Sequence, residues 1–125
     1  MAFINNPNQF GPRGARLPIN STNTRLTVSV SAASTDYVLV LADANTAITF
    51  NGTFEVQVPD EASVNFPVGT QIIVINRGTG TLTFDSVSAA TINSAGSVYD
   101  IAAEYGIASL IKTGADEWYL AGNLA

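Results

Sequence analysis

The sequence predicts an all-β fold: a compact sandwich or barrel of about nine or ten short strands, preceded by an extended N-terminal arm. Three observations predict this class. Short runs rich in Val, Ile, Thr and aromatic residues recur along the chain. Turn-forming residues separate these runs at intervals of roughly 8–12 residues, a spacing typical of sandwiches and barrels. Helical periodicity is missing, apart from one possible turn at 101–105.

The first two expected strands differ in their apolar pattern. Leu26, Val28 and Val30 alternate with small polar residues, which indicates a strand with one buried face. The run at 37–41 is continuously apolar (Tyr-Val-Leu-Val-Leu), which is typical of a strand buried on both faces. Small polar residues at 31–35 form the expected turn between them.

A hairpin is expected in the middle of the chain. Asn51 and Gly52 lie between two β-favouring runs, at 47–50 and 53–58. Asn-Gly in this setting is the strongest short-range hairpin signal, because both turn residues need a positive φ. Apolar residues take alternate positions in the second run, so we expect it to bury one face.

The second half of the chain continues with short strands. A loop at 59–67 precedes a strand at 71–76 that we expect to be buried. Gly78-Thr79-Gly80 is expected to form a hairpin turn, because no phosphate-loop lysine or helix accompanies it. Further strands are expected at 81–84, 90–93, 97–101, 107–112 and 117–121.

Charge divides the chain into a docking arm at 1–25 and a single domain at 26–125. The arm has three of the five cationic residues and no acid, whereas the domain has all ten acids with Arg77 and Lys112, for a charge of −8. Because the arm is rich in Pro, Gly and Asn, it cannot pack a core of its own, and we expect it to order on a partner. The residues expected to make that contact are Phe3, Ile4, Phe10, Arg13, Arg16 and Arg25.

Composition limits the partners. Charged residues are only 12% of the chain, about half the usual share, so we expect an interface to hide part of the surface. The net charge of −5 argues against general affinity for nucleic acid. No apolar run approaches the roughly 20 residues of a membrane span, and the N-terminus lacks signal-peptide character. We therefore expect neither a nucleic-acid nor a membrane partner.

Catalysis is not expected. With no Cys and no His, the chain lacks a thiolate nucleophile, the usual general base and the commonest transition-metal ligands. Asp60-Glu61 and Asp116-Glu117 are adjacent acid pairs. Neighbouring side chains of an extended segment point in opposite directions, so these pairs favour solvated loops over a catalytic cleft. We expect no enzyme and no cofactor.

Two binding hypotheses have weaker sequence support. Asp43 and Asn45 could hold a hard cation such as calcium, but they lack the regular acid spacing and the glycine of a calcium loop. Aromatic residues near the strands could stack on a sugar, although aromatics in strands more often fill cores and subunit contacts. These aromatic residues are Tyr37, Tyr99, Tyr105, Trp118 and Tyr119.

A series of motifs carries a family resemblance. The motifs, in order, are 35–44, Val58-Pro59, 66–72, 76–80, 91–96 and 105–122. Through them the chain, from Ser34 to Gly122, resembles the small β-modules of bacteriophage virion proteins, notably tail-fibre and decoration-type proteins. The resemblance implies a non-enzymatic structural module, commonly assembled as a homotrimer on the particle surface, with no catalytic residue to transfer.

The chain departs from the fibre pattern in one respect. Fibre proteins embed such a module in a longer chain, often with a stalk, whereas here it follows only the arm at 1–25. We therefore expect a capsid decoration or cement protein, whose arm binds the major capsid protein or another virion protein. It would be made in the cytoplasm of the host bacterium and lie on the virion surface, with its acidic body facing outward. The alternative is a tail-fibre or receptor-binding module that recognises a host-surface glycan.

Overall fold

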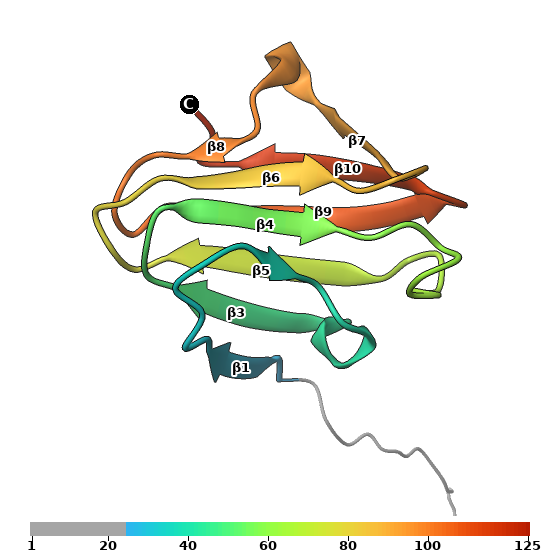
Figure 1. Ribbon diagram of the computed structural model, residues 1–125, viewed down its shortest axis with the longest axis horizontal. Helices are drawn as coiled ribbons and strands as arrows, with labels where there is room; N and C mark the ends of the chain where they lie inside the picture. Colours follow the sequence, from blue (N-terminus) through green and yellow to red (C-terminus); the bar gives the residue numbers. More distant parts are fainter. Residues whose placement is uncertain (1–24) are drawn as a thin grey trace, which may run out of the picture.

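The structure is a computed structural model and describes residues 25–125 (Figure 1). This part of the chain is all-β, as the sequence predicts, with two short 3-10 segments. The elements are β1 (Thr27–Val30), β2 (Tyr37–Val38), η1 (Leu41–Asp43), β3 (Thr46–Phe50), β4 (Phe54–Val58), β5 (Gln71–Asn76), β6 (Leu82–Ser86), β7 (Thr91–Ser94), η2 (Ala95–Ser97), β8 (Asp100–Ile101), β9 (Ile107–Gly114) and β10 (Glu117–Gly122).

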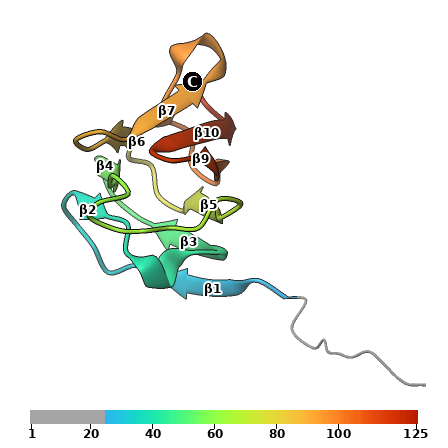
Figure 2. The ribbon, with the colours of Figure 1, turned by 90° about the vertical axis from the view of Figure 1, so that its right-hand side faces the viewer.

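The strands form two layers that face each other (Figure 2). A six-stranded sheet, the large sheet, has the order β1-β3-β5-β9-β10-β7. A four-stranded sheet, the small sheet, has the order β2-β4-β6-β8. Of the two architectures expected from the sequence, the fold is therefore the sandwich.

The first six strands build stacked coils. The chain passes from the large sheet to the small sheet and back, so β1, β3 and β5 are parallel in one layer, and β2, β4 and β6 are parallel in the other. Thr27 lies beside Thr46, and Thr46 lies beside Ile72. The antiparallel strands β8 and β9 then pair with β6 and β5 and extend both layers beyond the third coil.

The core fills the space between the layers. Along each strand alternate side chains point inward, and most of these positions are apolar; Asn76 in β5 and Lys112 in β9 are buried polar exceptions. Phe66 and Trp118 meet edge to face with ring centroids 5.4 Å apart. The core consists of Leu39, Ile48, Phe50, Phe54, Val56, Val58, Phe66, Ile72, Val74, Leu82, Phe84, Ile92, Ile101, Ala108, Leu110, Trp118 and Leu120.

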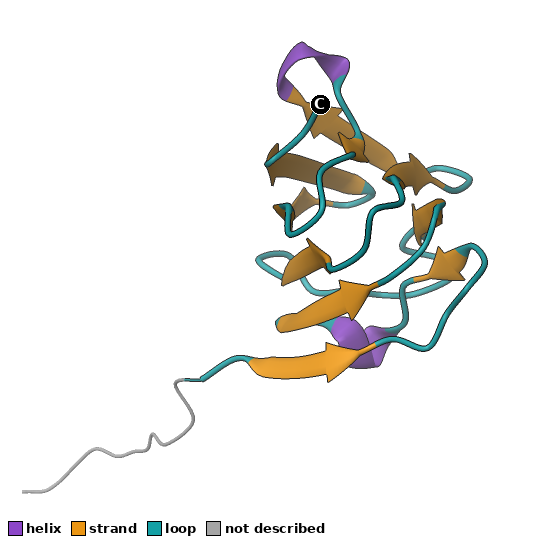
Figure 3. Cartoon of the chain, turned by 90° about the vertical axis from the view of Figure 1, so that its left-hand side faces the viewer, coloured by secondary structure: helices purple, strands orange, loops and turns teal. Residues whose placement is uncertain are grey.

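The prediction of two hairpins is wrong. Asn51-Gly52 joins β3 to β4, and Gly78-Thr79-Gly80 joins β5 to β6, but each pair of strands lies in different sheets. Both segments are corners of successive coils, stacked at one end of the molecule (Figures 1 and 3). A Cβ at Gly78 would collide with the Asn51 side chain. The glycine signal therefore reflects close stacking of corners, not a two-residue turn.

The first coil is more exposed than the sequence predicts. Residues 37–41 are not a doubly buried strand: β2 ends at Val38, and η1 begins at Leu41. Leu39 is buried, but Val38 is 44% exposed. The reason is position, because β2 is the edge of the small sheet and has only β4 beside it.

The segment expected as a strand at 97–101 is mostly not a strand. η2 and a left-handed backbone at Gly96 and Ser97 carry the chain away from the sheet, and β8 begins only at Asp100. The remaining expected strands are present within a few residues of their predicted bounds. Within residues 25–125, no helix has the length and apolar character needed to cross a bilayer.

Candidate interaction surface

The arm meets the body at one edge of the large sheet. Arg25 is exposed and precedes β1, the outermost strand of that sheet. Arg25 is the part of the expected contact that the structure describes. The other expected docking residues lie outside the described range: Phe3, Ile4, Phe10, Arg13 and Arg16.

The outward side of the large sheet carries apolar side chains. In β5, Ile72 and Val74 point into the core, so Ile73 and Ile75 point outward. The strand register carries this pattern across the sheet, with Gln71 and Thr113 as further outward positions that are polar. We call this surface the aliphatic face; it consists of Val28, Val30, Ala47, Thr49, Ile73, Ile75, Ile107, Ser109, Ile111, Tyr119 and Ala121.

No element of residues 25–125 covers the aliphatic face (Figure 2). Val30 is 68% exposed, Tyr119 is 51% exposed and Ile111 is 43% exposed. Among the outward strand positions of the large sheet, the charged residue is Glu117, beside the turn between β9 and β10. A contiguous apolar surface of this kind typically marks a contact site.

The outward side of the small sheet has the opposite character. The inward residues of β4 and β6 are buried and apolar, whereas the outward positions are polar. The Glu55 carboxylate accepts a hydrogen bond of 3.1 Å from the Gln57 amide. We call this surface the acidic face; it consists of Val38, Glu55, Gln57, Thr83, Asp85 and Asp100.

The free edge of β1 is a second feature that favours contact. The Ser31 amide donates to the Thr49 carbonyl at 2.9 Å, so alternate peptide groups of β1 face β3. The peptide groups of Val28 and Val30 therefore point toward the open side. β1 has neither proline nor charge, the usual means of protecting an edge strand.

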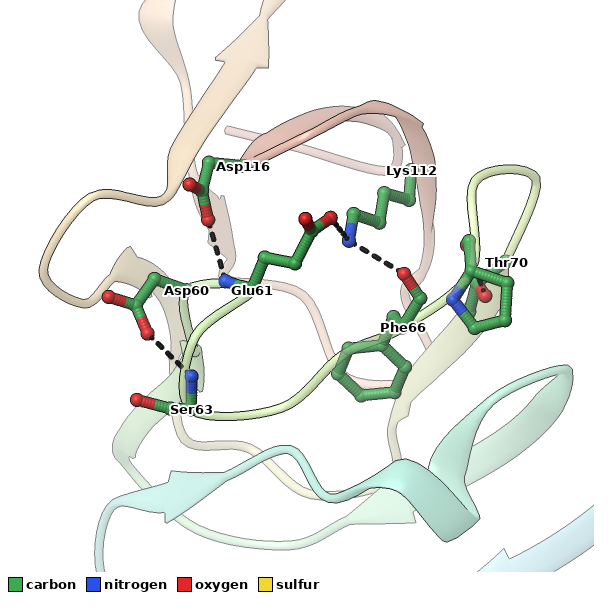
Figure 4. Close-up of polar contacts among 8 residues, drawn as sticks. Asp60, Glu61, Ser63, Phe66, Thr70, Lys112 and Asp116 are labelled. Atoms are coloured by element: carbon green, nitrogen blue, oxygen red, sulfur yellow. Dashed lines mark hydrogen bonds and ion pairs between the residues drawn. The ribbon is translucent and has the colours of Figure 1, made fainter.

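An ion pair between a buried lysine and a partly exposed glutamate ties the loop at 59–70 to β9 (Figure 4). Lys112 is 1% exposed, and its Nζ lies 2.7 Å from Glu61 Oε1. The same Nζ donates to the Phe66 carbonyl at 2.6 Å. The Glu61 amide donates to Asp116 Oδ1 at 2.6 Å. These bonds bring together residues of both adjacent acid pairs, a cluster that sequence spacing does not reveal.

Acids of both adjacent pairs accept hydrogen bonds from neighbouring residues of the chain. Asp60 Oδ1 accepts a 3.0 Å hydrogen bond from the Ser63 amide, and hydrogen bonding from Ser63 lowers the pKa of Asp60. Glu117 Oε1 accepts from the Thr113 hydroxyl at 3.2 Å. Within 25–125, no group of three or more acids forms a metal-binding cluster. The geometry of these hydrogen bonds supports anchoring of loops by the two acid pairs.

The residues of the calcium hypothesis also bond within the protein. Asp43 Oδ2 accepts from the Tyr37 hydroxyl and from the Val40 amide, both at 2.9 Å. Asn45 Oδ1 accepts from the Gln71 amide at 3.2 Å. Burial and the bond to Asp43 raise the pKa of Tyr37 to about 12. Asp43 and Asn45 thus hold the end of the first coil.

The aromatic residues do not form one platform. Trp118 is buried against Phe66, and Tyr37 packs on Phe50 with centroids 5.3 Å apart. Tyr99 lines a separate pocket of about 230 Å³, and Tyr105 is 73% exposed. Tyr119 lines an open groove of about 550 Å³ at the β7 side of the aliphatic face. The groove is lined by Asn93, Ser94, Ala95, Tyr119, Leu120 and Ala121.

Sequence reasoning missed the aliphatic face as a surface. The continuous apolar run of β5 indicated burial on both sides, and the apolar positions of β1 indicated burial on one. The signal that pointed to the face was the low charged fraction of 12%. Comparisons with protein-family models, with curated proteins and with solved structures found no match for this chain.

Proposed function

We propose that this protein is a non-enzymatic structural protein of a bacteriophage particle. In this proposal it is a capsid decoration, or cement, protein that assembles as a homotrimer on the particle surface. Its N-terminal arm docks on the major capsid protein or on another virion protein. The motif order between Ser34 and Gly122 supports the phage origin through the family resemblance.

The observation that carries the proposal is the contrast between the two outer faces. The aliphatic face suits contact with protein, because its strand positions are nearly free of charge. The acidic face suits solvent, because Glu55, Asp85 and Asp100 all point outward from it. A protein that coats a particle needs both kinds of surface at once.

The basic arm supplies the docking element of the proposal. Arg13, Arg16 and Arg25 can each pair with a carboxylate in two-point geometry. Phe3 and Phe10 offer apolar anchors for a groove on the partner. The arm therefore has the chemistry of a strap that orders when it binds an acidic protein surface.

Binding to particles tests the proposal. The full chain and a chain that starts at Leu26 are added to purified capsids of the phage that encodes the protein and, separately, to host cells. We expect the full chain to bind capsids and the truncated chain to lose most of that binding. Release from capsids should increase with salt, because arginine–carboxylate pairs are screened.

Matched arginine variants sharpen this test. Arg13→Ser with Arg16→Ser removes two arm cations, and Arg77→Ser removes an exposed cation of the body as the control. The arm variant should weaken capsid binding, while the body variant should not. Capsid binding that survives both truncation and the arm substitutions would contradict docking through the arm.

A second candidate is a tail-fibre or receptor-binding module that recognises a host-surface glycan. The groove beside Tyr119 and Asn93 favours it, since an aromatic ring and an amide are suited to sugar recognition. This candidate predicts binding to host cells that survives removal of the arm and is lost in Tyr119→Ala. Capsid binding without cell binding would exclude it.

A further inference from the structure

We propose that the aliphatic face is the surface through which copies of this chain meet. This inference rests on the homotrimer of the proposed function and names the surface that would form it. The partner is a second copy of the chain, and the contact is the outward side of β1, β3, β5, β9 and β10.

The size of the face suits an interface. The five strands of the face are spaced about 4.8 Å apart, so the face is about 19 Å wide, and its strands of four to eight residues run about 13–26 Å. The face thus covers roughly 250–500 Å² in projection, and the accessible area of its side chains is larger. The largest apolar patch of a typical monomer is about 300–600 Å², and a standard interface covers about 800 Å² on each partner.

Charge selects a second copy as the occupant. The body carries ten acids and two cations, so two copies repel each other over most of their surfaces. The aliphatic face avoids that repulsion, because its outward positions in β1, β3, β5 and β9 carry no charge. A partner recognised by charge would instead use the basic arm or the acidic face.

The edge of the face points to the same occupant. Val28 and Val30 are the most exposed large apolar residues of the aliphatic face, at 63% and 68%, and their peptide groups point away from β3. A neighbouring copy that covers these side chains also shields the open edge of β1. Without such cover, an uncharged edge strand promotes uncontrolled pairing.

A pair of matched variants of the full chain tests the inference. Ile111 on the aliphatic face and Val38 on the acidic face have nearly the same exposure, 43% and 44%. Ile111→Glu and Val38→Glu therefore place one carboxylate on each face at comparable positions. Sedimentation velocity over a concentration series measures self-association, and circular dichroism with thermal unfolding verifies that each variant folds.

We expect the unmodified chain and Val38→Glu to sediment as the same oligomer. Ile111→Glu should sediment as a monomer, with self-association weakened at least about 100-fold by the buried carboxylate. If Ile111→Glu fails to fold, Val28→Glu on the exposed edge strand makes the same test. A monomeric unmodified chain, or equal association of the folded aliphatic-face and acidic-face variants, would overturn the inference.

The arm variant separates this inference from the proposed function. Arg13→Ser with Arg16→Ser leaves the aliphatic face intact, so it should retain the oligomer while losing capsid binding. An oligomer that depends on Ile111 but never binds capsids would refute the decoration role and leave the interface standing. Capsid binding by a chain that stays monomeric would refute the interface and leave the decoration role standing.

Discussion

The outer faces of the two sheets differ far more than their inner linings. Both sheets bury apolar residues at alternate positions, such as Val74 in β5 and Val56 in β4. On the outside, β5 presents Ile73 and Ile75, whereas β4 presents Glu55 and Gln57. The inner lining specifies the sandwich, and the outer positions are free to specify contacts. We therefore propose that the contacts of this protein are encoded on the surfaces that the core does not constrain.

The largest loss of self-association should come from placing carboxylates on the aliphatic face, as the acidic face already has them. Val28 lies on β1 and Ile111 on β9, three strand spacings or about 14 Å apart, so their effects should add. The double variant Val28→Glu/Ile111→Glu should weaken self-association by about 10⁴-fold. Sedimentation equilibrium measures the self-association constant of each variant. The control double variant, Val38→Glu/Gln57→Glu, adds the same charge to the acidic face and should leave association nearly unchanged; a comparable loss there would show that net charge, not the face, matters.

A smaller effect, on the stability of the fold, is expected when the partner of a buried inward-facing lysine is removed. Glu61→Ala leaves the buried Lys112 ammonium without the carboxylate 2.7 Å away. We expect a loss of about 2 kcal/mol in the free energy of unfolding, less than the roughly 3–5 kcal/mol of a fully buried pair, because Glu61 is 39% exposed. Urea unfolding measures the change. Glu117→Ala, at an exposed site, should cost under about 0.5 kcal/mol, and equal losses would remove the assigned role of the ion pair.

Alkaline pH should affect the edge of the small sheet through Tyr37. Its pKa is about 12 in the folded protein and 10.0 in the unfolded chain. The protonated tyrosine therefore stabilises the fold fully below about pH 10, and this stability is lost as pH rises from about 10 to 12. Thermal unfolding should show a steeper alkaline decline for the unmodified chain than for Tyr37→Phe. Parallel declines would argue against the bond between Tyr37 and Asp43.

The smallest expected effect is that of salt on self-association through the aliphatic face. An interface of aliphatic side chains has almost no ion pairs to weaken, and salt also screens the repulsion between the acidic bodies, so the self-association constant should hold or rise by up to about twofold between low and physiological salt. Capsid binding through the arm should weaken over the same range. Sedimentation and capsid co-pelleting in one salt series compare the two. Self-association that falls with salt as steeply as capsid binding would place ionic pairs in the interface.

Local alternation predicted the strands well, because the side-chain period of a strand is a local property. The run from Phe54 to Val58 was assigned correctly, with the apolar positions buried and Glu55 and Gln57 outward. Pairing was not predicted, because it depends on long-range stacking. Asn51-Gly52 has the hairpin composition, yet it forms a coil corner packed on Gly78.

The coil repeat and the contact surface were harder to predict. Thr27, Thr46 and Ile72 are equivalent positions, but their unequal separations in the chain hide the repeat. Apolar strands at the edge and outside of a sheet have the same composition as buried ones, so sequence alone placed Val28 and Val30 partly in a core. The expected docking contacts of the arm, including Phe3 and Arg13, remain predictions outside the described residues.

Thiol reactivity tests the central claim most directly, that the aliphatic face is covered by other copies of the chain. The chain has no cysteine, so Ser109→Cys on the aliphatic face and Gln57→Cys on the acidic face each introduce a unique thiol at a half-buried site. The rate of reaction with a maleimide is measured as protein concentration rises. The account predicts that S109C becomes protected and Q57C does not. Protection of Q57C with constant reactivity of S109C would contradict it.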